Sequence, residues 1–110
     1  MGLYIKDTWT GSYSSFNAFR EALADAAGLG WLGQRAGFGG DEPFDPNHPL
    51  TALLNHSDCD GVIPLQQLSA LQQCLQSLTP KLPAPWAAWA AQFADGCQAH
   101  IDAAIDMRFE

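Results

Sequence analysis

"LLNHSDCDGVIPLQQLSAL", residues 53–71, gathers two carboxylates, a histidine and a cysteine around one glycine, between two leucine-rich runs. Pro64 suits the first turn of a helix, where proline's missing N–H costs nothing. Leucines follow at steps of three and four residues and form an apolar seam at Leu65, Leu68, Leu71, Leu75 and Leu78. The stretch therefore predicts a short helix over about 49–55, a polar loop, and a longer helix over 64–78.

Two more amphipathic helices are expected around this unit. Apolar residues recur at helical spacing over 15–27, Ser14 or Ser15 can cap that helix, and Gly28 can end it. A last helix starts at Pro85 and runs to about residue 106. Gly96 lies inside this helix at a cost of about 1 kcal/mol relative to alanine, which indicates close packing there.

The remaining segments are expected to be less regular. "LYIKDTW", residues 3–9, alternates and contains β-branched and aromatic residues, which predicts a short strand. Residues 28–48 are rich in glycine and are expected to be mostly loop. The fold class predicted for the 110 residues is mainly α with a minor β element. It corresponds to one small globular domain, 1–110, with a central EF-hand-like helix–loop–helix.

The central loop matches an EF-hand calcium loop in part. With Gly61 at the sixth position, where a sharp turn needs glycine, Asp58 and Asp60 take the third and fifth positions. The Val62 carbonyl then takes the seventh. The candidate metal ligands are His56, Asp58, Asp60, the Val62 carbonyl and Gln67.

The loop also departs from that pattern. His56 replaces the first carboxylate and Gln67 replaces the bidentate glutamate of the twelfth position. Because two anionic ligands are missing, calcium or magnesium should bind weakly, with a dissociation constant of about 10⁻⁴ to 10⁻³ M. No other cofactor is expected.

Two readings without a metal remain open. Asp58 and Asp60 can accept hydrogen bonds from the first N–H groups of the helix that follows, which makes the loop a polar corner. Alternatively, His56 and Cys59 can act as base and nucleophile. A complete catalytic set is not visible, so the chain is not expected to be an enzyme.

Charge limits the classes of partner. Twelve acidic residues against five basic ones give a net charge of −7, and the basic residues are scattered along the chain. A nucleic-acid backbone would be repelled, so we expect no nucleic-acid partner and instead a protein with a basic surface. In "GGDEPFDPNH", the candidate interaction residues are Asp41, Glu42, Phe44 and Asp45. These acidic groups also permit a second cation site or a plain exposed loop.

The cysteines and the hydropathy pattern indicate the compartment. The chain has three cysteines, Cys59, Cys74 and Cys97, and no CxxC pair. An odd number of widely spaced cysteines is expected for free thiols in a reducing cytoplasm. No apolar run approaches the roughly 18 residues of a membrane span, so no membrane association is expected. Cys97 and His100 could share a zinc ion with Cys74, but packing is the favoured role for the cysteines. His100 is then expected at the surface or half-buried.

Three motifs, "WTGSYSSFNAFR", "GFGG" and "PLTALLNHSDCDGVI", resemble an uncharacterised group of small bacterial proteins. That group shares W-x-G-x-Y-S-x-F followed by P-L-x-x-L-L-N-H-S-D-C-D-G. The resemblance covers roughly the first two-thirds of the chain and implies no activity. The segment between the first helix and the central motif is shorter here than in many members of the group.

Two hypotheses of function follow. The first is a small acidic cytoplasmic interaction or accessory protein, such as an inhibitor or a factor in bacterial or phage conflict. The second is a weak divalent-cation module built on the 56–67 loop. The leucine seam can pair with the last helix or with a second copy, which leaves a homodimer open.

Overall fold

The structure is a computed structural model that describes residues 2–29, 43–45, 47–56 and 61–110. The predicted fold class, mainly α with a minor β element, is confirmed. In chain order the elements are β1 (Gly2–Ile5), β2 (Trp9–Ser12), α1 (Tyr13–Ala26), α2 (Thr51–Leu54), β3 (Val62–Ile63), α3 (Leu65–Leu78), α4 (Trp86–Ala103) and β4 (Met107–Arg108). A 3₁₀ turn, Thr79–Lys81, joins α3 to α4.

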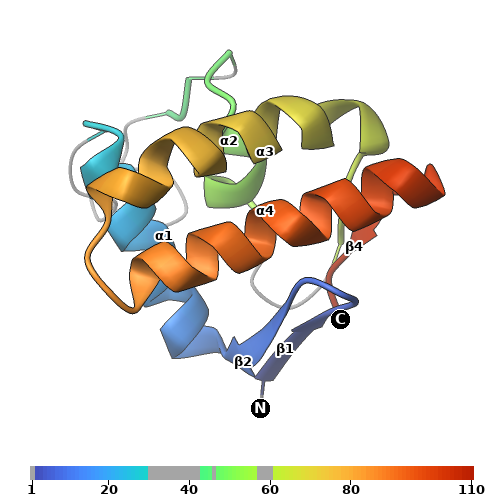
Figure 1. The fold of residues 1–110 in the computed structure, drawn as a ribbon, viewed down its shortest axis with the longest axis horizontal. Coiled ribbons are helices and arrows are strands. Elements are labelled where there is room, and N and C mark those ends of the chain that lie inside the picture. The colour runs from blue at the N-terminus through green and yellow to red at the C-terminus, as the bar shows by residue number, and fades with distance from the viewer. Residues whose placement is uncertain (1, 30–42, 46, 57–60) are drawn as a thin grey trace.

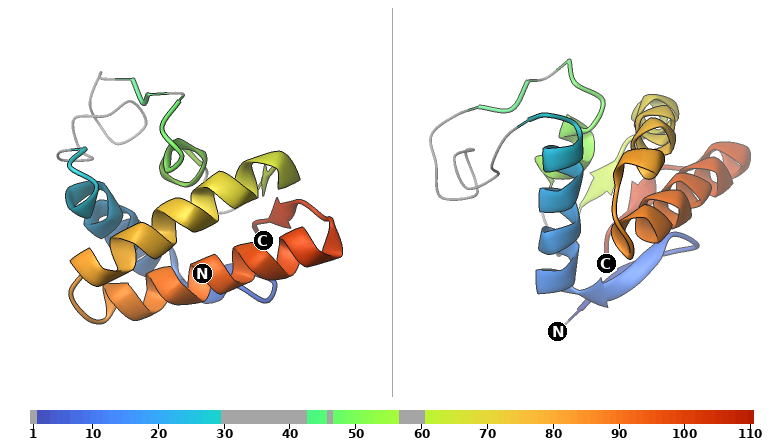
Figure 2. Two further views of the ribbon diagram at one scale, coloured as in Figure 1. Left: turned by 45° about the horizontal axis from the view of Figure 1, so that its top comes forward. Right: turned by 60° about the vertical axis from the view of Figure 1, so that its left-hand side comes forward.

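Helices α3 and α4 form one layer of the molecule (Figure 1). They run side by side in opposite directions, because the connection between them is short. Helix α1 lies across from this pair, with α2 between them at one end and the β1–β2 hairpin at the other (Figure 2). Among the described residues, no helix combines the length and the apolar character that a membrane span requires.

The N-terminal segment differs from the prediction of a single strand. β1 and β2 form an antiparallel hairpin in which Gly2 pairs with Ser12 and Ile5 with Trp9. The helix also begins earlier than predicted, because Ser12 is its cap. The Ser12 Oγ accepts a hydrogen bond from the backbone N–H of Ser15 at 3.1 Å, so the prediction of Ser14 or Ser15 as the cap was wrong.

Other boundaries shift by a few residues. The short helix before the central loop is only the four-residue α2. Pro64 is the residue before α3 rather than its first residue, with an extended ψ of 145°. Helix α4 ends at Ala103, three residues before the predicted end. The strand β4 that follows it was not predicted; it pairs with β3, Val62 opposite Arg108 and Ile63 opposite Met107.

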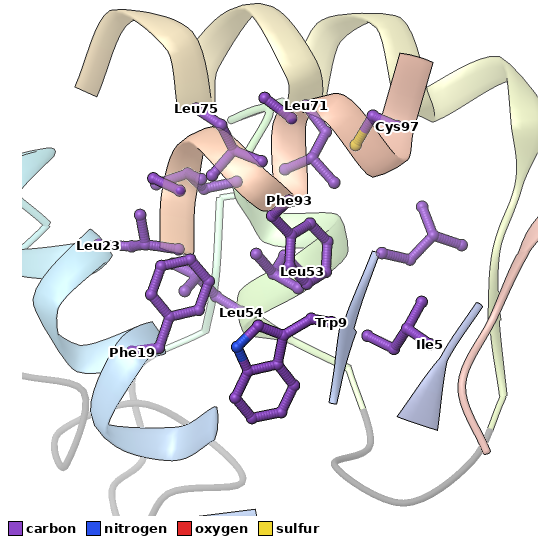
Figure 3. Close-up of a cluster of buried hydrophobic side chains, with 14 of the residues drawn as sticks. Ile5, Trp9, Phe19, Leu23, Leu53, Leu54, Leu71, Leu75, Phe93 and Cys97 are labelled. Atoms are coloured by element: carbon purple, nitrogen blue, oxygen red, sulfur yellow. The ribbon is translucent and has the colours of Figure 1, made fainter. Parts of the chain in front are cut away.

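The core lies between α1, the α3–α4 layer, α2 and the hairpin (Figure 3). Trp9 of the hairpin lies against Phe16 of α1 and Trp89 of α4, with ring centroids 5.6 and 5.4 Å away. The predicted leucine seam of α3 is buried at its last four positions, Leu68, Leu71, Leu75 and Leu78. Apolar side chains at helical spacing therefore position the helices, and the aromatic residues attach the hairpin to them.

The C-terminal segment ties distant parts of the chain together. The Phe109 N–H donates to the Gly61 carbonyl at 2.8 Å, and the Glu110 N–H donates to the Tyr4 carbonyl at 2.8 Å. Phe109 also forms a bridge with Ile5 of β1. The end of the central loop, the end of α4 and the N-terminal hairpin consequently meet in one region.

Candidate functional site

The described members of the predicted metal loop do converge. His56, Val62 and Gln67 line one hollow of about 520 Å³. Its other walls come from the segment around α2 and from the first two turns of α3, and carry side-chain amides and a second histidine, His48. Asp58 and Asp60, the two carboxylates of the predicted site, lie outside the described residues.

The His56 ring is part of the packing at this hollow. Its centroid lies 4.0 Å from that of Phe109. On another side lies Gly61, where an added Cβ would come within 3.3 Å of two ring atoms. Gly61 also has a φ of +96°, in the region where glycine is favoured. The glycine therefore serves both the turn and the close approach of His56.

Arg20 places a positive charge beside the start of the loop. This α1 residue is 3% exposed, and its Nη1 donates to the His56 carbonyl at 2.6 Å and to the Leu54 carbonyl at 3.3 Å. Its guanidinium also lies over the Phe16 ring, 4.7 Å from the centroid. A buried guanidinium repels a divalent cation more strongly than an exposed one would, because less water screens it. The backbone carbonyl of His56, at the first loop position, is therefore already bound by the positively charged side chain of Arg20.

The second predicted set of metal ligands is the zinc alternative, which consists of Cys74, Cys97 and His100. Burial raises the pKa of the Cys97 thiol to about 12, which opposes the thiolate that zinc requires. His100 is 4% exposed, so the prediction of a surface or half-buried position was wrong. Across the described ranges, no three His, Cys, Asp or Glu side chains are grouped closely enough to hold a metal ion.

The predicted interaction residues lie only partly within the described chain. Phe44 is half-buried and packs against the core, so it anchors its segment. Asp45 is exposed, and its Oδ1 accepts a hydrogen bond from the Asn47 N–H at 2.9 Å. Asp41 and Glu42 lie outside the described residues.

The charged surface shows a pattern that the sequence did not predict. All eight acidic residues in the described part of the chain are exposed, against three exposed basic residues, Lys6, Lys81 and Arg108. Asp7 from the hairpin turn and Asp95 from α4 line the same hollow of about 310 Å³, beside the half-exposed ring of Tyr4. No basic residue lines this hollow, which we call the acidic hollow.

Its two carboxylates come from residues far apart in the chain, and a side-chain hydrogen bond joins the two elements that carry them. The Gln92 side chain of α4 donates to the Thr8 carbonyl at 2.8 Å, which fixes α4 to the hairpin turn that carries Asp7. No local motif in the sequence joins Asp7 to Asp95, so only the tertiary packing reveals the pair.

Comparisons of the chain with protein-family models, curated proteins and solved structures found no match.

Proposed function

We propose that this protein is a small acidic interaction protein that binds a protein partner through that partner's basic surface. The observation that carries the proposal is the acidic hollow, which is lined by two carboxylates from separate elements and by an exposed tyrosine. A lysine or arginine side chain matches both features, because carboxylates neutralise its charge and an aromatic face attracts a cation.

The distribution of charge over the rest of the surface supports the same role. Eight exposed acidic residues against three exposed basic ones produce a negative field around the described part of the molecule. Such a field accelerates the approach of a basic partner and repels acidic ones. Its effect extends about 10 Å at 0.1 M salt, so binding should weaken as salt rises.

The test is affinity capture from an extract of the source cells at low salt, followed by binding measurements on the purified captured protein. The double variant Asp7→Asn, Asp95→Asn should weaken binding, because it removes both charges of the acidic hollow. The matched control is Asp25→Asn, Asp102→Asn, which changes the net charge equally at two other exposed positions. Equal effects of the two variants, salt-independent binding, or no capture at low salt would each contradict the proposal.

A weak divalent-cation module is the second candidate, favoured by the convergence of His56, Val62 and Gln67 on one hollow. The buried positive charge of Arg20, which donates to the His56 carbonyl, opposes the binding of a cation at this loop. Thermal unfolding with calcium, magnesium or chelator tests the idea, since a ligand of the native state raises the unfolding temperature. No shift at about 10 mM calcium, above the weak-site range, would remove this candidate. If Asp58 and Asp60 only cap the helix, Asp58→Ala, Asp60→Ala lowers stability equally with and without metal.

A further inference from the structure

A pocket of about 560 Å³ lies where the hairpin turn, β3, the end of α4 and the last residues of the chain meet. Its volume falls within the range of small-molecule sites, about 300–1,000 Å³. It is separate from the acidic hollow and plays no part in the proposed function. Its lining combines a buried histidine, two basic side chains, two acidic ones and exposed apolar groups.

The histidine, His100, is 4% exposed. Its Nδ1 lies 2.7 Å from the Gly96 carbonyl oxygen of its own helix. A carbonyl can only accept, so Nδ1 carries the hydrogen, and in the neutral ring Nε2 has a lone pair. Within the described residues Nε2 has no hydrogen-bond partner. Because Nδ1 is bound to its own helix, Nε2 is the ring nitrogen left for a ligand in the pocket that His100 lines.

The basic side chains are Lys6 and Arg108, two of the three exposed basic residues in the described chain. They come from the hairpin turn and from β4, which are brought together by the pairing of the C-terminal segment with the hairpin. In a protein of net charge −7, two cations at one pocket form a local site for a carboxylate.

The acidic side chains have different roles. The Asp106 Oδ1 accepts the hydrogen bond of the Leu65 N–H at 2.7 Å and so serves the first turn of α3. Glu110 also lines the pocket and adds a negative charge to its lining. The pocket therefore offers both signs of charge, which suits a ligand that carries both.

The apolar part of the lining is unusual for this surface. Val62 and Ile105 are 41% and 46% exposed, and both line the pocket. An aliphatic group placed on them would remove apolar surface from water, worth about 25 cal/mol per Å².

We propose that this pocket binds a free aliphatic α-amino acid of the size of leucine. The carboxylate lies between Lys6 and Arg108, the ammonium donates to the Nε2 of His100 and faces Glu110, and the aliphatic side chain covers Val62 and Ile105. Each group of the ligand then meets a group of matching chemistry in the pocket.

The test follows the imidazole nitrogens of His100 by ¹⁵N NMR during titration with L-leucine. The Nε2 resonance should shift on binding, because Nε2 gains a hydrogen-bond donor. Three analogues isolate the contacts: 4-methylpentanoate lacks the ammonium, 3-methylbutylamine lacks the carboxylate and alanine lacks the aliphatic chain. Each should bind about tenfold more weakly or less. An unchanged Nε2 resonance at saturating leucine, or an analogue that binds as well as leucine, overturns the proposal.

Variants provide a second, independent readout. Lys6→Gln and Arg108→Gln change exposed residues and should each weaken leucine binding about tenfold, the loss of roughly one charge-assisted contact. Lys81→Gln is the matched control, because Lys81 is exposed but lies away from this pocket. If Lys81→Gln weakens binding as much as Lys6→Gln does, the effect is one of net charge and the assignment of this pocket is wrong.

Discussion

At Gly96, helix α4 lies very close to Thr8 of the N-terminal hairpin. A Cβ added there would come within 2.2 Å of the Thr8 Oγ1 and 2.6 Å of the Thr8 Cβ. The Gln92 side chain, one helical turn before Gly96, donates a hydrogen bond to the Thr8 carbonyl. The absence of one methyl group therefore sets the distance between α4 and the hairpin, and with it the position of Asp7 relative to Asp95.

We expect Gly96→Ala to destabilise the protein by about 1–3 kcal/mol, the usual cost of overpacking. The sign is informative, because alanine would otherwise stabilise a helix interior by about 1 kcal/mol. Urea unfolding measures the change. In a double-mutant cycle, Thr8→Gly removes the three atoms nearest to the new Cβ, so the cost of Gly96→Ala should largely disappear. A stabilising Gly96→Ala would contradict the close contact.

The buried thiol of Cys97 should make the free energy of unfolding depend on pH in the alkaline range. Burial raises its pKa from 9.0 to about 12, so the folded protein keeps the proton that the unfolded chain releases above pH 9. The free energy of unfolding should therefore be unaffected by this thiol below its ordinary pKa and should fall above it, by up to about 1.4 kcal/mol per pH unit.

The measurement is urea unfolding with reductant at about pH 8 and pH 10, on either side of the ordinary thiol pKa. Cys97→Ala serves as the control, because lysines and tyrosines titrate equally in both proteins. The variant should be less stable at the lower pH but should lose less stability on going to the higher one. Equal losses in the two proteins would show that the Cys97 proton does not contribute.

The C-terminal end of helix α4 is determined by the backbone conformation of one residue. Its interior follows from the spacing of its apolar residues, but its end depends on Ala104, which has a left-handed φ of 56° and ψ of 46°. The Ile105 N–H then donates to the His100 carbonyl at 3.1 Å, and the chain turns into β4. An L-residue with a side chain occupies this conformation at a cost of roughly 1–2 kcal/mol.

Ala104→Gly should raise the free energy of unfolding by about 1 kcal/mol, since glycine adopts the left-handed conformation without that cost. Ala99→Gly is the matched control in the same helix. It is an exposed interior position, where glycine should lower stability by about 1 kcal/mol. Opposite signs for two identical substitutions in one helix would confirm the helix end, and equal signs would refute it.

The elements that could be predicted from the sequence are those with local signals. The leucines of α3 and the aromatic residues of α1 and α4 repeat at helical spacing, and their helices were located to within a few residues. β3 and β4 contain two residues each, too few for an alternating pattern. Their pairing joins segments far apart in the chain, so no local signal marks it.

The same reason explains which site residues could be predicted. Asp58, Asp60 and Gly61 stand together in the sequence, so a candidate loop could be proposed from the sequence alone. His100 was expected at the surface or half-buried, but it is 4% exposed. In the fold it shares a pocket with Lys6 of the hairpin turn and with Arg108 and Glu110 of the C-terminal segment, which no local pattern in the sequence indicates. The pairs Asp7 with Asp95 and Lys6 with Arg108 likewise exist only in the folded molecule.

At the scale of the whole molecule, the charge is distributed unevenly between surface and core. In the described part of the chain, the one buried charged side chain is Arg20, and the eight acidic residues lie at the surface. Exposed negative charges repel each other more in the compact state than in the unfolded chain, because folding brings them closer together. This repulsion opposes folding and is screened by salt.

We therefore expect sodium chloride to raise the unfolding temperature. Going from about 10 mM to about 150 mM shortens the Debye length from roughly 30 Å to roughly 8 Å, which is less than the size of the molecule. The expected gain is a few degrees, since a change of about 1 kcal/mol shifts a domain of this size by about 4–8 °C. The double variant Asp25→Asn, Asp102→Asn should be more stable at low salt and respond less to salt. If sodium chloride leaves the unfolding temperature unchanged, or the variant responds as strongly as the parent protein, repulsion between surface carboxylates does not limit the stability of this fold.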